Sequence, residues 1–208
     1  YLPNGKSGSV TFLGTVSPAG GNLKEPVTES TKKAARCFYA LSQGRADSKR
    51  YPAIDPLESY SKYLEYPEVE EYLGEKIEKG WVSLVRKGKT IVQRGKEAND
   101  QINILGDDGV PVDYHERFWK SELIDFVVLQ QDAFDDIDAN CPMERQQMMY
   151  KMVLDICEYD FDFADFEACS KFFKGLINLF RQMNYSEWKS EKFYDYQKQI
   201  EEYVASAK

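Results

Sequence analysis

The sequence predicts a mainly α-helical protein, in which a C-terminal helical bundle is preceded by the last strand, loop and helix of an α/β domain. Apolar residues recur at helical spacing through most of the second part of the chain. A short β-branched and aromatic run at 9–16 is typical of a buried strand. A proline-containing stretch at 50–61, called the corner below, separates the two patterns. We therefore place the domain boundary there, between 1–56 and 57–208.

Composition favours a folded protein of one or two domains. The chain has 208 residues, of which 42% are hydrophobic and 30% charged, and this is typical of a soluble globular protein. The net charge of -8 argues against a surface for nucleic acid or for an anionic membrane. No run of about 18 apolar residues occurs, so we expect no direct membrane insertion.

The cysteines and the histidine give no metal-binding pattern. Cys37, Cys141, Cys157 and Cys169 are far apart and form no CxxC pair. Because no secretory signal is recognisable, we expect reduced thiols in a cytosolic protein. The single histidine, His115, excludes a His-based metal cluster, and we expect it on the surface near the start of a helix.

The first part of the chain predicts a strand at 9–16, a loop at 17–28 and a helix at 29–43. Gly20-Gly21 in the loop is not a phosphate cradle, because no Gly-Lys-Ser/Thr follows. One strand cannot bury itself, so this part is incomplete as a domain. The chain also lacks an initial methionine, and we interpret it as the C-terminal piece of something longer.

The corner holds Tyr51 just before a predicted helix. Its two prolines fix φ and remove two amide donors. Asp55 is a suitable helix cap, Pro56 suits the first helical position, and Glu58 stands where a capping-box acid belongs. These signals predict a helix at 56–65. Taken alone, the residues favour a proline-stiffened linker in which the tyrosine is packing filler.

The second part predicts a series of helices and an acidic turn at 106–111. Asp113 and Glu116 fit a capping box after that turn. Acids and aromatics alternate at 159–166, which indicates a loop tucked on the bundle or a surface for a partner. The expected helices are 56–65, 68–105 with a break near 86–90, 114–131, 142–159, 163–182 and 187–205.

Three stretches between residues 8 and 142 resemble, in the same order, a known family. The first is Gly8-Ser9-Val10-Thr11 followed by Ser17-Pro18-Ala19-Gly20-Gly21 and Pro26-Val27-Thr28, and the second is Tyr51-Pro52-Ala53-Ile54-Asp55-Pro56-Leu57. The third is Gln130-Gln131-Asp132-Ala133-Phe134 leading to Cys141-Pro142. Together they resemble the catalytic subunit of V-type and archaeal-type ATPases. The F-type β subunit is a weaker match, because the first and third stretches tell against it.

The resemblance implies a function and partners. Residues 1–56 would be the C-terminal remnant of a P-loop-type nucleotide-binding domain, and 57–208 the C-terminal helical domain. The intact subunit would couple ATP hydrolysis or synthesis in a cytoplasmic head, peripheral to the membrane, to rotor rotation and H⁺ or Na⁺ transport. Its partners would be the neighbouring non-catalytic subunit and the central rotor shaft subunit. ATP or ADP with Mg²⁺ would bind the intact subunit, and neither would bind tightly to this fragment.

The resemblance also assigns residues to the base of the nucleotide. Tyr51 and Phe134 match the two aromatic positions against adenine, and stacking on such rings is worth about 1–3 kcal/mol each. Gln130 and Gln131 are neighbours for the adenine edge or the ribose. Without the resemblance, Phe134 would be interpreted as a core residue.

Rotor and redox roles follow from the resemblance in the same way. In the family, the loop at 17–28 and the acidic turn face the central shaft. Cys141 matches a cysteine that pairs with a P-loop cysteine in some members, although an inert thiol is the ordinary interpretation. The residues expected to contact the rotor are Gly20, Gly21, Asn22, Leu23, Asp107 and Asp108.

The sequence contains no GxxxxGK[ST] motif, so we assign no catalytic residue and no metal ligand to this chain. The phosphate-binding and Mg²⁺-binding residues are expected upstream of Tyr1, and the fragment alone is expected to be inactive. The alternative is a stand-alone helical protein-interaction module without nucleotide chemistry.

Overall fold

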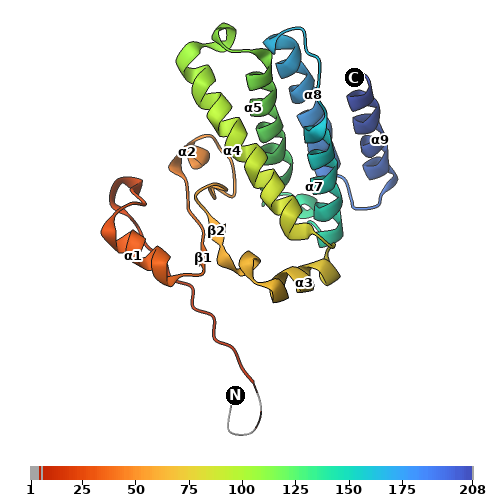
Figure 1. Cartoon of the computed structure of the whole chain (residues 1–208). Helices are drawn as coiled ribbons and strands as arrows, with labels where there is room; N and C mark the ends of the chain where they lie inside the picture. Colours follow the sequence, from red (N-terminus) through yellow and green to blue (C-terminus); the bar gives the residue numbers. More distant parts are fainter. Residues whose placement is uncertain (1–4, 6, 208) are drawn as a thin grey trace.

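The computed structural model describes residue 5 and residues 7–207. A bundle of helices forms most of the molecule, and residues 7–34 extend away from it (Figure 1). The long helices of the bundle are α4 (Trp81–Leu105), α5 (Val112–Ile124), α7 (Met143–Glu158), α8 (Phe166–Asn184) and α9 (Glu191–Ala205).

The core lies where α5, α7, α8 and α9 meet. Phe173, Leu176 and Phe180 recur at helical spacing on α8 and are completely buried. Phe193 of α9 packs into the same cluster. The helices expected at 142–159, 163–182 and 187–205 are confirmed, because their apolar stripes are strong and regular. The loop expected after α7 is also confirmed, and it buries Phe161 in the core.

The break in the region 68–105 lies elsewhere than expected. Helix α3 (Pro67–Lys76) ends before Gly80, whose φ of 84° lies in the left-handed region that glycine adopts readily. Helix α4 then runs unbroken through 86–90. The expected break at 86–90 is wrong, because Gly88 serves helix packing and does not end the helix. A Cβ there would lie 2.1 Å from the Tyr150 hydroxyl, so this glycine allows α4 to approach α7 closely.

The acidic turn is confirmed as the short 3₁₀ helix η3 (Asp107–Gly109) between α4 and α5. The expected capping box after it is wrong, because the N-cap of α5 is Pro111 and Asp113 instead pairs with Arg117 at 2.7 Å. His115 is not on the surface as expected. It is 3% exposed, because its ring stacks on Phe166.

Helix α5 continues into a π-helical turn, η4 (Asp125–Leu129), which confirms the helix expected at 114–131. A loop at 130–135 follows. The short helix α6 (Asp136–Ala139) is capped by Asp135, whose Oδ1 accepts hydrogen bonds from the next backbone amides. This segment carries the third of the three matching stretches.

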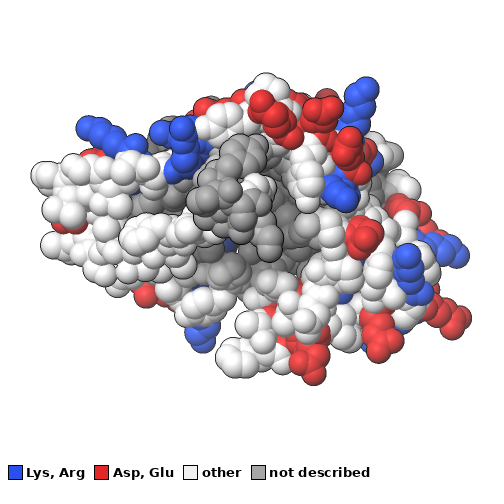
Figure 2. Space-filling model, turned by 90° about the horizontal axis from the view of Figure 1, so that it is seen from below, with Lys and Arg blue, Asp and Glu red and all other residues white. Residues whose placement is uncertain are grey.

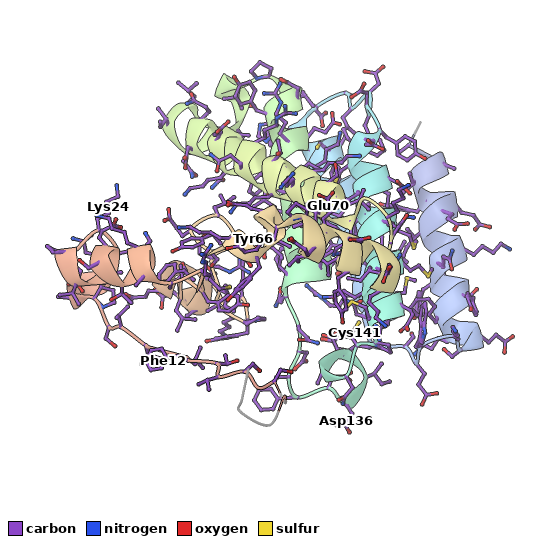
Figure 3. The ribbon with its side chains drawn as sticks, turned by 60° about the horizontal axis from the view of Figure 1, so that its bottom comes forward. Phe12, Lys24, Tyr66, Glu70, Asp136 and Cys141 are labelled. Atoms are coloured by element: carbon purple, nitrogen blue, oxygen red, sulfur yellow. The ribbon has the colours of Figure 1, made fainter. Side chains whose placement is uncertain are left out.

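The buried strand expected at 9–16 is wrong. The segment is extended but unpaired, and Val10 and Phe12 are 98% and 91% exposed. Figure 3 shows Phe12 on this segment, outside the bundle. The physical reason is that no strand lies beside it in the part of the chain described. The loop at 17–28 contains a 3₁₀ turn, η1 (Ala19–Gly21).

The helix expected at 29–43 is confirmed only in its first part, and a small antiparallel sheet forms beside the corner. Helix α1 (Pro26–Ala34) ends within the expected span 29–43. Strand β1 (Cys37–Phe38) then pairs with β2 (Tyr60–Ser61), which interrupts the helix expected at 56–65. Long-range pairing therefore overrides local helix signals. The remaining elements here are α2 (Gln43–Asp47) and the 3₁₀ helix η2 (Lys62–Glu65).

Charge is mixed on the surface. On the face in Figure 2, Asp and Glu side chains gather toward the right, with Lys and Arg among them. No helix in the described part of the chain is both long and apolar enough to cross a membrane.

Candidate functional site

The corner is held against the end of α5. The backbone amide of Gln131 donates a hydrogen bond to the carbonyl of Tyr51 at 2.9 Å. On the other side, Asp55 Oδ1 accepts from the amides of Leu57 and Glu58, which fixes the turn after the tyrosine. Two of the three matching stretches, far apart in sequence, therefore lie side by side.

Four charged side chains join the same two segments, and we call them the ion-pair cluster: Arg45, Arg50, Glu122 and Asp125. Arg45 contacts both carboxylate oxygens of Asp125, at 2.7 and 3.0 Å. Arg50 contacts both carboxylate oxygens of Glu122, at 2.7 and 2.9 Å, and also bonds Asp125. Such bidentate pairs fix orientation as well as distance.

A cavity of about 660 Å³ lies beside this contact. The structure brings together there all four residues expected at adenine: Tyr51, Gln130, Gln131 and Phe134. The cavity opens between the corner, the loop at 130–135 and the end of α8, and this size is ordinary for a small-molecule site.

Both aromatic rings at the cavity are exposed. The Tyr51 side chain is 53% exposed and Phe134 is 101% exposed. Phe134 is thus not a core residue, contrary to the expectation from its residue type alone. An Asx turn presents it, because Asp132 Oδ1 accepts a hydrogen bond from the Phe134 amide at 2.9 Å. Two exposed rings that line one cavity are suited to a flat aromatic ligand.

The side chains of Gln130 and Gln131 differ in their hydrogen bonds. Gln131 Nε2 donates to the Asp138 carbonyl at 2.7 Å, so this side chain joins the loop to α6. Gln130 is held through its backbone amide, which donates to the Asp125 carbonyl at 2.8 Å. Among the residues that the structure describes, no hydrogen bond engages the side-chain amide of Gln130. Its donor and acceptor are thus free for a ligand edge.

The sequence did not point to several residues of the cavity. Lys49 and Arg181 bring positive charge to it, and Tyr185 and Phe126 add aromatic surface. Asp138 is 8% exposed, and burial raises its pKa. Arg181 comes from α8, far along the chain from the nearest motif, so no local pattern could point to it.

The ion-pair cluster was missed as well, although one signal was available. Asp125 is the only acid in the apolar run 123–129, and a lone acid there must find a partner when the run is buried. Arg50 directly precedes Tyr51. Neither fact alone identifies the ion pair between Arg50 and Asp125.

Cys141 lies beside a second, smaller cavity of about 240 Å³, which shares Gln130, Gln131 and Asp138 with the first. The cysteine sits between α6 and α7 (Figure 3). Burial raises the pKa of its thiol, and this favours the unreactive protonated form at neutral pH.

The residues expected at the rotor lie away from the cavity, in two separate places. Gly20 and Gly21 form η1, with φ of 62° and 71°, and are followed by Asn22 and Leu23 just before α1. Asp107 and Asp108 lie at the far end of α4, in the turn at the top of Figure 1. The structure does not bring these two groups together.

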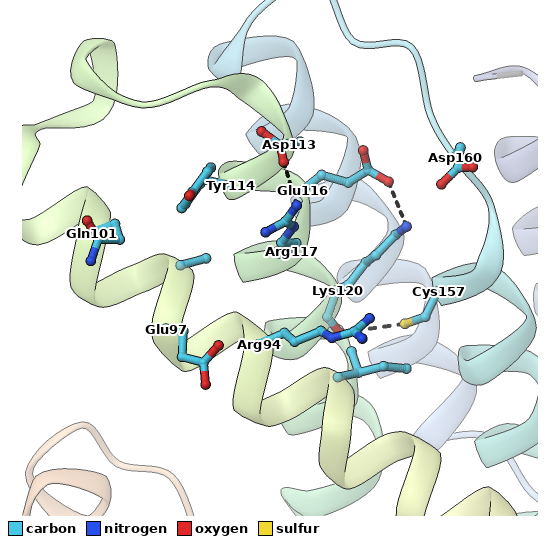
Figure 4. Close-up of a pocket in the computed structure, with 12 residues that line it drawn as sticks. Arg94, Glu97, Gln101, Asp113, Tyr114, Glu116, Arg117, Lys120, Cys157 and Asp160 are labelled. Atoms are coloured by element: carbon cyan, nitrogen blue, oxygen red, sulfur yellow. Dashed lines mark hydrogen bonds and ion pairs between the residues drawn. The ribbon is translucent and has the colours of Figure 1, made fainter.

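Another cavity, of about 850 Å³, lies between α4, α5 and the end of α7 (Figure 4). Its charged groups are largely paired with one another. Lys120 pairs with Glu116 at 2.6 Å, and Arg117 pairs with Asp113. The Cys157 thiol donates to the Lys120 carbonyl, and burial raises its pKa to about 12. Arg94, Glu97 and Asp160 also line the cavity, so its charge is of both signs, and the buried Cys157 thiol is a poor nucleophile.

Metal ligation is not apparent either. Within residues 5 and 7–207, no group of three or more His, Cys, Asp or Glu side chains is arranged to hold a metal ion.

Two family models match the chain. The nucleotide-binding domain of the ATP synthase alpha/beta family matches residues 3–61. The C-terminal domain of V and A type ATP synthase matches residues 70–161. The two models follow one another along the chain and together include the corner, the cavity loop and the turn between α4 and α5.

Curated relatives agree with these models. The chain is 39% identical over 192 residues to the V-type ATP synthase alpha chain of Protochlamydia amoebophila, which covers 92% of this chain and 32% of that protein. It is 36% identical over 204 residues to the Treponema denticola alpha chain, which covers 98% of this chain and 32% of that protein. The chain thus spans about a third of the length of these relatives.

A solved structure shares the fold. It is described as a unique ATP synthase subunit NeqB from Nanoarcheaum equitans, with a TM-score of 0.51 and 19% identity over 68% of this chain and 32% of that one. At this identity the likeness concerns the fold alone. The models and the relatives carry the assignment: the chain belongs to the V-type ATP synthase alpha chain family, of which it contains residues of the nucleotide-binding domain followed by the C-terminal helical domain.

Proposed function

We propose that this chain supplies the adenine side of the nucleotide pocket in a V-type ATP synthase alpha chain. The observation that carries the proposal is the pair of exposed rings, Tyr51 and Phe134, at one cavity. Adenine is flat and apolar on both faces, so two rings hold it by stacking. The free amide of Gln130 suits the hydrogen-bonding edge of the base.

Charge at the same cavity is consistent with a nucleotide. Lys49 and Arg181 line it, and their positive charge favours an approaching phosphate chain. Asp132 and Asp138 also line it, so the cavity is not strongly cationic. We therefore assign the base to this chain, and the phosphates and Mg²⁺ to residues elsewhere in the intact subunit. Binding of ATP or ADP by this chain alone is expected to be very weak.

In the intact subunit, we assign this chain to a head that is cytoplasmic and peripheral to the membrane. That head couples ATP hydrolysis or synthesis to rotor rotation and to H⁺ or Na⁺ transport. Residues 1–56 belong to its nucleotide-binding domain and 57–208 to its helical domain. The two exposed loops, at Gly20–Leu23 and at Asp107-Asp108, are the proposed contacts with the central shaft. Exposed faces of the same chain are proposed to meet the neighbouring non-catalytic subunit.

The proposal is tested in the full-length alpha chain with two ligands. ATP carries the base, whereas inorganic tripolyphosphate carries only the phosphates. Tyr51→Ala and Phe134→Ala are expected to weaken ATP binding by about 5- to 100-fold each, from the lost stacking. Their affinity for tripolyphosphate should stay at the parent value. Tyr63→Ala removes a similarly exposed tyrosine away from the cavity and is the matched control.

Calorimetry on the four proteins gives the decisive comparison. If both cavity variants bind ATP as tightly as the parent, the base does not bind between the rings. The helical interaction module without nucleotide chemistry would then be the better account of this chain.

A further inference from the structure

The ion-pair cluster has an unusual position for a surface salt bridge. The side chains of Arg45 and Asp125 are 13% and 9% exposed, and those of Arg50 and Glu122 are 24% and 13% exposed. Two arginines and two acids balance in charge, and each arginine meets a carboxylate through two nitrogens. The Arg50 guanidinium also lies 4.8 Å from the centre of the Phe126 ring. Such a cluster fixes geometry much more firmly than an exposed pair does.

The cluster spans the two segments that form the cavity. Arg45 and Arg50 stand on α2 and the corner, and Glu122 and Asp125 stand at the end of α5. Arg50 and Tyr51 are successive residues, so ion pairs that fix the Arg50 side chain also restrict the backbone that carries the Tyr51 ring. The carbonyl of Asp125 holds the Gln130 amide, which places the second wall of the cavity.

Few other polar contacts hold the Tyr51 side chain. Its hydroxyl donates to the Ala46 carbonyl at the long distance of 3.4 Å, and half of the side chain faces solvent. The remaining tie is the backbone hydrogen bond from Gln131. The orientation of this ring therefore depends largely on how the corner is fixed to α5.

We propose that Arg50 is a positioning residue for the nucleotide base, which fixes Tyr51 opposite Phe134 through its paired contacts with Glu122 and Asp125. This inference rests on the proposed function, because it concerns the same cavity. Arg50 itself does not line that cavity. Its effect on binding is exerted through the adjacent tyrosine.

The test is a double-mutant cycle in the full-length alpha chain. Arg50→Met removes the charge and the paired contacts but keeps a long side chain. We expect it to weaken ATP binding about tenfold and to leave tripolyphosphate binding unchanged. Once Tyr51→Ala is present, adding Arg50→Met should cause little further loss, because the ring that it positions is gone. Arg117→Met is the matched control, since it breaks an exposed ion pair with Asp113 on α5, the helix that carries Glu122.

The cycle separates the inference from the proposed function. If Tyr51→Ala weakens ATP binding but Arg50→Met does not, the inference is wrong and the proposed function stands. Equal losses of ATP and tripolyphosphate binding in Arg50→Met would also overturn it, because they indicate general damage. If Tyr51→Ala has no effect, the proposed function itself fails. Should Arg50→Met not fold, Glu122→Gln tests the same contact, since it removes one charge and keeps the shape.

Discussion

Phe134 owes its exposure to two turn-forming acids. Asp132 and Asp135 accept hydrogen bonds from nearby backbone amides. These bonds fix the conformation of the loop, although the Phe134 ring is not buried. A single exposed apolar side chain is ordinary on a protein surface, so the exposure of Phe134 supports the proposed site only because Tyr51 lines the same cavity. The residue type alone suggested burial, and only the turn shows why the ring points outward.

The reactivity of the Cys141 thiol is a further prediction at the residue scale. Because burial raises its thiol pKa, only a small fraction is thiolate at pH 7, and alkylation by iodoacetamide is expected to be slower than for a free cysteine. The rate should rise with pH as the thiolate forms. Cys157 and Cys169, with pKa values of about 12, should react more slowly still. Mass spectrometry of labelled peptides from neutral to alkaline pH gives all three rates. A Cys141 rate at pH 7 above that of free cysteine would instead support a redox role.

Individual residues were predicted unevenly from the sequence. Tyr51 and Phe134 were predicted from their motifs, whereas Arg50 and Arg181 were not. Their partners come from segments far away along the chain, and spacing carries no information on such contacts. His115 was expected on the surface near the start of a helix, but stacking on Phe166 buries it.

Helices α4 and α5 pack unusually closely at Gly95. A Cβ on this residue would lie 2.1 Å from the Ser121 Cβ and 3.0 Å from the Arg117 carbonyl oxygen. The second contact is with backbone, which cannot move aside as a side chain does. Gly95 therefore permits the close packing of α4 on α5, the two helices joined by the acidic turn.

Gly95→Ala is accordingly expected to destabilise the protein by about 1–3 kcal/mol, the usual cost of overpacking. Gly74→Ala is the matched control, because a Cβ there meets only ordinary contact at 3.8 Å. The control should leave stability unchanged or raise it by up to about 1 kcal/mol through helix propensity. Urea unfolding followed by circular dichroism measures both. Equal stability of the two variants would contradict the close packing.

Elements were predicted well where the apolar stripe was long. Helices α7, α8 and α9 have regular stripes and were placed within a few residues. The helix expected at 29–43 was confirmed only as far as Ala34, and the helix expected at 56–65 was wrong, because β1 and β2 pair across the corner, and local propensity does not report this pairing. These errors arise where tertiary contacts, which local propensity does not include, decide the local structure.

At the scale of the whole molecule, stability resides in the bundle. No residue between 7 and 16 belongs to the buried core, and the large apolar side chains there face solvent. The core cluster draws instead on residues from Leu123 to Val204. The extended segment is suited to pair with a sheet that another part of the intact subunit would provide.

Removal of residues 1–16 is therefore expected to leave the thermal midpoint of the chain within about 2 °C, because residues 7–16 contribute nothing to the described core. Differential scanning calorimetry at matched concentration measures the shift. As the control, Phe173→Ala should lower the midpoint strongly, since that ring is completely buried. A fall of more than about 4 °C on truncation would mean that the segment stabilises the bundle.

An experimental structure of the full-length alpha chain, with ATP bound in its assembly, would test the proposed adenine site without any intermediate step. We expect the adenine ring to lie between Tyr51 and Phe134 in van der Waals contact with both, and Arg50 to keep its paired contacts with Glu122. Adenine bound elsewhere, with these two rings in solvent or against another subunit, would show that the proposed site is wrong.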